Sequence, residues 1–372
     1  MLKRTGCIER QQRLLKRMEQ ENWDLFVTGN FRTVYYFTGA LTPADVPALL
    51  AIHGDGKCTL VTSSKQAEWA DEILPLETWS MDRAVTMPMR DATSLLANAL
   101  LRKPGAPISR CAVEMAATPG LVEGAVRHLS GASITDASET LLALRKRKEE
   151  DEIEEIRQAL GLCSTAYLTA RDAIEPGLTE IDVFNALQSA VTRSAGTSVA
   201  LLGDFACGER AIGGGGPPTE RLVRPNDLYI LDLFPAPALY FGDTCRTFSV
   251  GPPTDLQYRA WEIVNEAVQL AESSVKPGVA ARDVYRTVKE FLDGHELTAG
   301  SFLHHAGHGI GHHGHEAPRL IPGSDDVFEV GDVFTLEPGV YTKALHGGIR
   351  LEDNYVVRDG GLENLFDFPR DL

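Results

Sequence analysis

Apolar residues in the first third of the chain come in short runs separated by turn residues. Residues 24–29 (DLFVTG) and 34–40 (VYYFTGA) are rich in aromatic and β-branched residues, which predicts two strands. Residues 48–64 (ALLAIHGDGKCTLVTSS) predict a β-hairpin that turns at Gly54-Asp55-Gly56. Helical patterns follow at 89–102 and 119–129. An α/β domain is therefore expected at the start of the chain.

A charged run, LRKRKEEDEIEEIRQ, covers residues 144–158. Apolar positions recur every three or four residues through it and beyond it, as on one face of a helix: Ile153, Ile156, Leu160 and Cys163. We interpret Lys146 to Glu152 as the exposed start of a second domain, with the charges on the solvated face of its first helix. The predicted domains are residues 1–145 and 146–372.

The predicted second domain contains an internal repeat. Residues 174–188 (IEPGLTEIDVFNALQ) align without a gap on residues 275–289 (VKPGVAARDVYRTVK), and Pro, Gly, Asp and Val are identical. Each copy has a Pro-Gly turn that leads into a helix with matching apolar positions. Similarity between two amphipathic helices can arise by chance, but duplication of an α+β half-domain explains more of the match. Duplication predicts a pseudo-twofold fold with a site between the halves.

The overall composition is that of a globular protein, with 43% hydrophobic and 24% charged residues in 372. The 52 acidic and 36 basic residues give a net charge of −16, which argues against nucleic-acid binding. The sequence predicts neither a signal peptide nor a membrane span. Six scattered cysteines without CxxC spacing are expected to be reduced thiols of a cytoplasmic protein.

Carboxylates stand at the ends of apolar segments in the second half of the chain. Asp232 ends an apolar strand, and Asp243 follows eleven residues later in a predicted hairpin. Glu337 ends another apolar strand, and Arg350 and Glu352 are two residues apart and therefore on one face of a strand. Charged residues in apolar strands need a partner or a metal, and four carboxylates with a histidine suit two hard divalent ions.

The segment HHAGHGIGHHGHEAP, residues 304–318, holds six of the ten histidines of the chain. Its glycines at 307, 309, 311 and 314 make a helix improbable, because each costs about 1 kcal/mol relative to alanine. The helical HExxH type of zinc site is therefore excluded. Glycine also lets the backbone approach an ion closely.

At this point the sequence resembles the metal-dependent peptidases of the pita-bread fold, which include prolidase, aminopeptidase P, methionine aminopeptidase and creatinase. NFRTVYYFTGA is similar to the first domain of the creatinase type, and LRKRKEEDEIEEIRQA to the first helix of the catalytic domain. The resemblance implies an α+β protein, with a creatinase-like N-terminal α/β domain followed by a pseudo-twofold pita-bread catalytic domain. Five metal-ligand positions match in order: Asp232 and Asp243 in DLFPAPALYFGD, His308 in GHGIG, Glu337 in TLEPG and Glu352 in IRLED.

The resemblance also implies roles for these residues. Asp232 would bind the first ion, Asp243 and Glu352 would bridge both, and His308 and Glu337 would complete the second. The ions are expected to be manganese, with cobalt, zinc and iron as alternatives. His304 and His315 match the histidines of the family that face the substrate.

A water between two cations becomes hydroxide near neutral pH. Glu337 could relay the proton of that water to the leaving amine. His315 could stabilise an oxyanion, and Arg350 could orient a carboxylate or meet the substrate. The expected protein is a cytoplasmic homodimer that cleaves the bond before proline in small peptides and interacts with neither nucleic acid nor membrane.

Two positions depart from the pattern of the family. Relatives that cleave before proline carry a further histidine at about Gly215, but this chain has none between His128 and His295. His312 stands where an apolar residue is typical. These departures leave two alternatives open. The first is a non-peptide hydrolase or lyase of the creatinase, ectoine hydrolase or sulfoniopropionate lyase type. The second is a binding protein that has lost catalysis. We expect either that His312 or His313 reaches into the pocket to replace the missing group, or that both face solvent.

Overall fold

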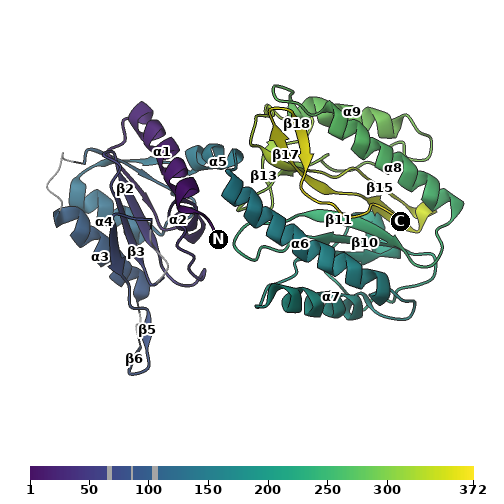
Figure 1. Cartoon of the computed structure of the whole chain (residues 1–372), viewed down its shortest axis with the longest axis horizontal. Helices are drawn as coiled ribbons and strands as arrows, with labels where there is room; N and C mark the ends of the chain where they lie inside the picture. Colours follow the sequence, from purple (N-terminus) through teal and green to yellow (C-terminus); the bar gives the residue numbers. More distant parts are fainter. Residues whose placement is uncertain (65–68, 85–86, 103–107) are drawn as a thin grey trace. The chain divides into compact units, whose positions relative to one another are not determined.

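The computed structural model describes residues 1–64, 69–84, 87–102 and 108–372 (Figure 1). By its internal contacts the chain divides into two compact units, Met1–Arg145 and Lys146–Leu372. Each unit has buried apolar clusters of its own.

The first unit is built on a six-stranded mixed sheet with the order β4-β3-β2-β1-β7-β8. The predicted hairpin is confirmed, because β2 and β3 pair antiparallel on either side of residues 54–57. Both predicted helices are also present, as α3 and α4. The strands are β1 (Leu25–Thr28), β2 (Leu49–His53), β3 (Cys58–Thr62), β4 (Glu72–Pro75), β5 (Trp79–Ser80), β6 (Arg83–Ala84), β7 (Arg110–Val113) and β8 (Ser133–Asp136). The helices are α1 (Arg4–Glu21), α2 (Phe31–Thr38), α3 (Pro88–Arg102), α4 (Gly120–Ser130) and α5 (Ser138–Lys146).

The strand predicted at residues 34–40 is wrong, because this segment forms helix α2. The side chain of Asn30 accepts a hydrogen bond from the backbone N–H of Arg32 at 3.1 Å and so caps the start of the helix. Gly39, with φ of 67°, ends it in a left-handed conformation. Residues 33–38 are all buried, so aromatic residues typical of strands pack around the whole helix.

The second unit has two helix pairs with strands between them, as Figure 1 shows. The helices are α6 (Glu150–Ala173), α7 (Glu180–Ala195), α8 (Asp255–Ser274) and α9 (Ala281–Asp293), with short 3-10 turns η1 (Gly208–Gly213) and η2 (Lys343–Leu345). One sheet has the order β11-β10-β9 and the other β13-β12-β14-β17-β18, and β15 pairs with β16. The strands are β9 (Gly203–Cys207), β10 (Leu228–Leu233), β11 (Thr244–Ser249), β12 (His308–Gly309), β13 (Glu316–Arg319), β14 (Val333–Leu336), β15 (Gly339–Thr342), β16 (Gly347–Arg350), β17 (Asp353–Arg358) and β18 (Gly361–Asn364).

The predicted internal repeat is confirmed by equivalent hydrogen bonds in the two halves. The backbone N–H of Gly177, before α7, donates to the carbonyl oxygen of Val223 at 2.9 Å. In the same way the N–H of Gly278, before α9, donates to the carbonyl oxygen of Phe328 at 2.8 Å. Both glycines have positive φ, 96° and 89°. The duplication therefore extends from the helices into the segments that precede β10 and β14.

The equivalence reaches the strands that carry the predicted ligands. Asp227, just before β10, accepts a hydrogen bond from the backbone N–H of Arg224 at 2.9 Å. Asp332, just before β14, accepts one from the N–H of Glu329, also at 2.9 Å. Five residues after these two aspartates come Asp232 and Glu337. Two of the five predicted ligands thus occupy equivalent positions in the two halves.

The charged run at the start of the second unit is less exposed than predicted. The four apolar positions of α6 are buried as expected, but Lys148, Asp151, Glu152 and Glu155 are buried as well. The ammonium group of Lys148 pairs with a carboxylate oxygen of Glu316 at 2.8 Å, and the other carboxylate oxygen of Glu316 accepts from the backbone N–H of His313. Since a buried charge needs a partner, these residues form internal ion pairs and hydrogen bonds instead of a solvated face.

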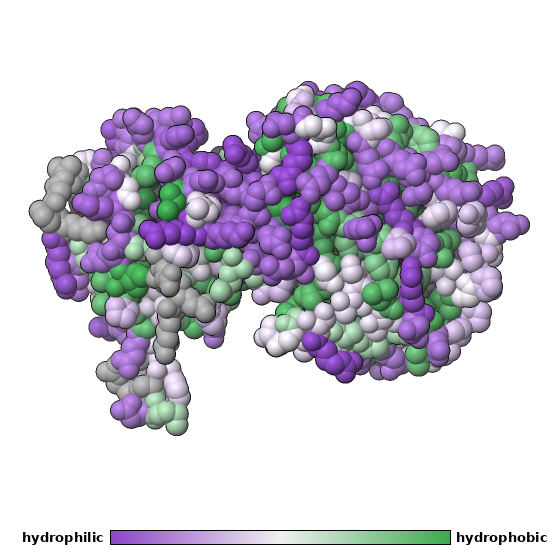
Figure 2. All heavy atoms as spheres, viewed as in Figure 1, coloured by the Kyte–Doolittle hydropathy of each residue, from purple (hydrophilic) through white to green (hydrophobic). Residues whose placement is uncertain are grey.

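Hydrophilic residues cover much of the region of α8 on the face that Figure 2 shows. This agrees with the amphipathic pattern of that helix, which buries one stripe that includes Ala260, Val264 and Val268. None of the helices in the described parts of the chain is long and apolar enough to cross a lipid bilayer.

Candidate metal centre and substrate cavity

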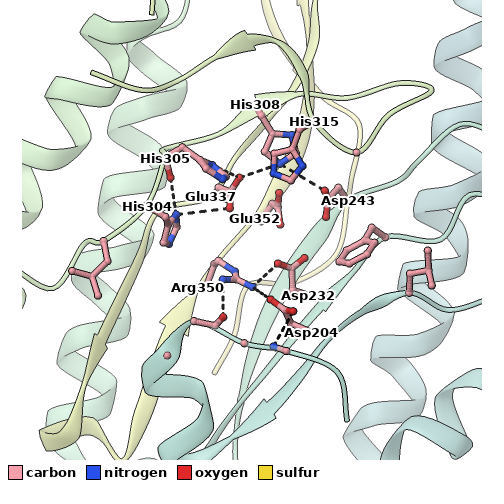
Figure 3. Close-up of a pocket in the computed structure, with 18 of the residues that line it drawn as sticks. Asp204, Asp232, Asp243, His304, His305, His308, His315, Glu337, Arg350 and Glu352 are labelled. Atoms are coloured by element: carbon pink, nitrogen blue, oxygen red, sulfur yellow. Dashed lines mark hydrogen bonds and ion pairs between the residues drawn. The ribbon is translucent and has the colours of Figure 1, made fainter. Parts of the chain in front are cut away.

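A cavity of about 780 Å³ lies in the second unit. All eight residues predicted to bind metal or act in catalysis line it: Asp232, Asp243, His304, His308, His315, Glu337, Arg350 and Glu352. Figure 3 shows their side chains converging from both sheets. The cavity has the size of a small-molecule or short-peptide site.

Antiparallel pairing brings three carboxylates together. Asp232 lies on β10 opposite Cys245 of β11, and Asp243 comes directly before β11. The segment after β16 pairs with the same strand, because Glu352 and Cys245 exchange backbone hydrogen bonds of 3.0 and 3.3 Å. The side chains of Asp243, His308 and Glu352 each offer a ligand atom within 4.8 Å of the others.

Glu337 and His308 come from neighbouring strands of the larger sheet. Glu337 follows β14, and His308 begins β12, which pairs with β14. The hydroxyl of Thr335 accepts from the backbone N–H of His308 and donates to Glu337, at 3.2 and 3.3 Å. A Cβ atom on Gly307 would lie 1.9 Å from the carbonyl oxygen of Thr335, so only glycine permits this approach.

Burial and mutual repulsion dominate the electrostatics of the carboxylates. Burial raises the pKa of Asp232 to about 6, even though Arg350 opposes this change. Burial also raises the pKa values of Asp243 and Glu352 well above the ordinary range, and neighbouring carboxylates add to the effect. Burial acts on Glu337 in the same direction, but hydrogen bonds with His305 and His308 outweigh it and hold its pKa well below the ordinary value.

Buried oxygen atoms at this cluster lack hydrogen bonds. Among the described residues, neither carboxylate oxygen of Glu352 nor Oδ1 of Asp232 has a hydrogen-bond partner. Buried carboxylate oxygens are normally hydrogen-bonded or bound to a cation. These atoms therefore fit a site for hard cations.

The contacts of His308 also fit a cation site. Its Nδ1 lies 3.1 Å from the carbonyl oxygen of Gly309, to which it donates. Its Nε2 lies 3.2 Å from a carboxylate oxygen of Glu337 and 3.7 Å from one of Asp243. Lone pairs at these distances repel unless a proton or a cation lies between them.

His304 belongs to a chain of hydrogen bonds along one wall of the cavity. Its Nδ1 donates to the carbonyl oxygen of His305, and its Nε2 accepts from the hydroxyl of Tyr341, both at 2.7 Å. The Tyr341 oxygen accepts in turn from Arg350 at 3.1 Å. Burial lowers the pKa of His304 to about 4, so this imidazole is neutral near pH 7.

Arg350 is held between two carboxylates. One of its terminal nitrogens lies 2.5 Å from Asp232 and 2.9 Å from Asp204. No local motif singles out Asp204, because an aspartate after a glycine is common in turns. Tyr341 was missed for a similar reason, since a tyrosine in a strand is ordinary core material.

His305 also lines the cavity, although the sequence assigned it no role. Its Nδ1 lies 3.0 Å from Glu337, and its ring meets that of His315 edge to face. His315 stacks on His308 with ring centroids 3.9 Å apart. Figure 3 shows these imidazoles on one side of the carboxylate cluster. Three histidines besides His308 thus face the cavity.

The proposal that His312 or His313 reaches into the pocket is wrong, because neither lines the cavity. The alternative, that both face solvent, fails for His312. Its ring is buried against Tyr240, with centroids 4.1 Å apart, and its Nδ1 contacts the carbonyl oxygen of Leu239 at 3.2 Å. The side chain of His313 is exposed.

Comparison with known families covers nearly the whole chain. Residues 154–359 match the profile of metallopeptidase family M24. Residues 10–147 match the creatinase/prolidase N-terminal domain.

Individual relatives and solved structures agree with these matches. The chain is 28% identical to the Xaa-Pro dipeptidase of Lactobacillus helveticus over 370 residues, which cover 95% of this chain and 96% of that one. It is 26% identical to the Xaa-Pro dipeptidase of Pyrococcus furiosus over 367 residues, which cover 98% and 99%. The structure of the Xaa-Pro dipeptidase from Bacillus anthracis matches with a TM-score of 0.83 at 25% identity, covering 98% of this chain and 99% of that one.

Proposed function

The chain belongs to metallopeptidase family M24, with a creatinase/prolidase N-terminal domain in front of the catalytic one, and from this premise we propose that it is a dinuclear-metal Xaa-Pro peptidase. The observation that carries the proposal is the buried cluster of four carboxylates and His308, in which several oxygens have no hydrogen-bond partner among the described residues. The names of the related Xaa-Pro dipeptidases support the bond before proline as the target.

Five residues would hold the two ions: Asp232, Asp243, His308, Glu337 and Glu352. Four carboxylates and one imidazole favour a hard ion such as Mn²⁺ over a thiophilic one. When bound, the ions would supply a hydroxide near neutral pH as the nucleophile.

The remaining roles follow from the positions of the side chains. Glu337, whose carboxylate is kept ionised beside His305, would take up a proton and pass it to the leaving nitrogen. His315 would donate to the developing oxyanion, and the neutral His304, fixed by Tyr341, would hold the substrate. Arg350 is bound to Asp232 and Asp204, so it positions the carboxylate of Asp232.

Apolar side chains around the cavity suit the ring of proline. Leu202, Phe234, Phe241 and Leu303 line it together with the polar groups. A non-peptide substrate is the second candidate, because the wall at Gly213–Gly216 offers no side chain where a proline-cleaving enzyme is expected to have a histidine. A homodimer and a cytoplasmic location remain predictions.

A direct test loads the metal-free full-length protein with Mn²⁺ and measures hydrolysis of Ala-Pro, Ala-Pro-Ala and, as a non-peptide guanidino compound, creatine. We expect hydrolysis before proline and about two ions bound per chain. In His308→Ala both the hydrolysis and the metal binding should be lost, because one imidazole ligand is removed. His313→Ala is the control, because that side chain is exposed outside the cavity. Hydrolysis of creatine alone would replace the proposal with the non-peptide alternative, and full activity after chelation would contradict it.

A further inference from the structure

Four consecutive glycines form part of the cavity wall. Gly213 to Gly216 all line it and contribute backbone alone. Gly214, Gly215 and Gly216 have φ of 95°, 151° and 132°, which side-chain-bearing residues rarely adopt. Two charged side chains hold this strip in place: the N–H of Gly216 donates to Oδ1 of Asp204, and Arg350 donates to the carbonyl oxygen of Gly214, both at 2.9 Å.

The carboxylate of Asp204 occupies the space above Gly215. A Cβ atom built on Gly215 would lie 2.1 Å from Oδ2 of Asp204, so a side chain at 215 and the carboxylate of Asp204 exclude one another. The Asp204 side chain is 30% exposed and lines the cavity. At this part of the wall, the group presented to a substrate is therefore a carboxylate.

Apolar side chains extend the same wall. Asp204 pairs with Asp232 in the register of β9 and β10, and Phe234 donates its N–H to the carbonyl oxygen of Leu202 at 3.0 Å. Leu202 lies two residues before Asp204 and Phe234 two after Asp232, so all four side chains point to one face. A carboxylate bordered by an aliphatic and an aromatic side chain suits an organic cation.

The fixed charges of the cavity also favour a cationic ligand. Five carboxylates line it, counting Asp204, whereas Arg350 is the one guanidinium or ammonium group among the described lining residues. Arg350 and two divalent ions would together offset all five. A hydroxide nucleophile then leaves one negative charge in excess, and Arg350 already has protein partners on both terminal nitrogens. The terminal nitrogens of Arg350 are therefore not free for a substrate carboxylate.

We propose that Asp204 determines specificity, and that its carboxylate above the glycine strip selects substrates with an ammonium or guanidinium group on a side chain within two residues of the scissile bond. The proposal rests on the proposed peptidase function and adds the charge of the substrate to it. Asp204 would select by attraction to the cation and would disfavour an anion at the same place.

Isosteric peptides separate charge from shape in the test. Arginine and citrulline differ as a guanidinium differs from a urea, so Arg-Pro is compared with citrullyl-Pro, and Ala-Pro-Arg with Ala-Pro-citrulline. The Mn²⁺-loaded full-length protein should show a kcat/KM about tenfold higher for the cationic member of at least one pair, as expected for a charge-assisted contact. Glu-Pro should be a poorer substrate than Gln-Pro for the same reason.

Asp204→Asn keeps the shape of the side chain and removes its charge. This variant should reduce the preference to within about threefold while it still hydrolyses the citrulline peptides. Asp325→Asn is the control, because that side chain is 99% exposed and lies outside the cavity, and it should keep the full preference. A wild-type protein without preference, or an Asp204→Asn variant that retains it, overturns the proposal.

A binding measurement keeps the two proposals distinguishable. Calorimetric titration with n-butylguanidinium and n-butylurea compares a cation with its neutral isostere without requiring turnover. We expect the cation to bind about tenfold more tightly to the wild type and the difference to vanish in Asp204→Asn. If no peptide is hydrolysed, the peptidase proposal fails and this titration alone decides on Asp204. If peptides are hydrolysed without a charge preference and both ligands bind equally, the role of Asp204 fails alone.

Discussion

Individual buried carboxylates of the cavity lower the stability of the folded protein when no cation is bound. Glu352 is buried, and neither of its oxygens has a hydrogen-bond partner among the described residues. Its pKa is raised first by burial and then by Asp243 and Glu337. Ionising such a group inside the protein opposes folding, whereas two bound cations would reverse the effect.

Replacing Glu352 with glutamine should therefore affect the metal-free and metal-loaded proteins in opposite ways. We expect Glu352→Gln to raise the stability of the metal-free protein by about 1 kcal/mol, roughly 2–4 °C in melting temperature, because a buried charge is removed. The rise in melting temperature that Mn²⁺ produces in the wild type should largely disappear, since a ligand is lost.

Calorimetric melting with and without Mn²⁺ measures both effects. The control is Glu175→Gln, an exposed residue outside the cavity, which should leave both temperatures unchanged. An equal stabilisation of Glu352→Gln and wild type by Mn²⁺ would remove Glu352 from the proposed ligand set.

The sequence predicted most of the cavity at this scale, but not all of it. The eight predicted site residues stand in recognisable local motifs, and the structure brings all eight to one cavity. Asp204 and His305 have no local signal, because their importance depends on Gly215 and Glu337, which are distant in the sequence. Binding of metal by the five predicted ligands stays a prediction.

At the scale of helices and strands, two predictions from the sequence pattern are wrong, and burial explains both. The aromatic residues of α2 favour a strand, but the Asn30 cap and full burial stabilise a helix. The charges of residues 144–158 suggested a solvated helix face, but Lys148 and three of the acidic residues are buried. A charge pattern along one segment cannot predict this, because the partner Glu316 comes from β13, far along the chain.

The ion pair of Lys148 with Glu316 should anchor the loop that carries His315. Glu316 also accepts the backbone N–H of His313, so one carboxylate connects the start of the unit to the histidine segment. Lys148→Met leaves this charge buried without its cation, which should cost about 3–5 kcal/mol of unfolding free energy. Urea denaturation of the metal-free protein measures the loss.

A matched control is available in α9. Lys289 and Asp293 form an ion pair whose side chains are both 38% exposed, and Lys289→Met should cost only about 0–1 kcal/mol. If Lys148→Met costs no more than Lys289→Met, the buried pair does not anchor the loop. Lys148→Met/Glu316→Leu should recover part of the loss, because it removes the buried carboxylate as well.

The whole catalytic unit reflects its duplication. The repeat in the sequence predicted two similar halves, and the paired hydrogen bonds at Gly177 and Gly278 confirm this in the segments before β10 and β14 as well as in the turns before the helices. Asp232 and Glu337, at equivalent positions of the two halves, line one cavity, so the two halves contribute to one site. The resemblance of two short helical segments could not show how far the repeat extends, because the equivalence of Asp227 and Asp332 is visible only in their matching hydrogen bonds.

The stability of the whole protein should depend on pH with opposite signs in the metal-free and metal-loaded states. The pKa values of Asp243 and Glu352 are raised by burial, so the folded state binds more protons than the unfolded state and loses stability as pH rises. Lowered pKa values of about 4 for His304 and His315 act in the opposite direction, but only at pH values below the ordinary histidine pKa. Above about pH 6.5, the ordinary histidine pKa, the two imidazoles no longer oppose the carboxylates, which then set the sign of the slope.

In that window the melting temperature of the chelated protein should fall as pH rises. With Mn²⁺ present it should rise instead, because protons compete with the ions for the same carboxylates and that competition weakens as pH increases. Differential scanning calorimetry at several pH values, in chelator and in Mn²⁺, measures both slopes. Equal slopes in the two states would mean that the cavity carboxylates do not bind the ions, whatever the activity of the enzyme.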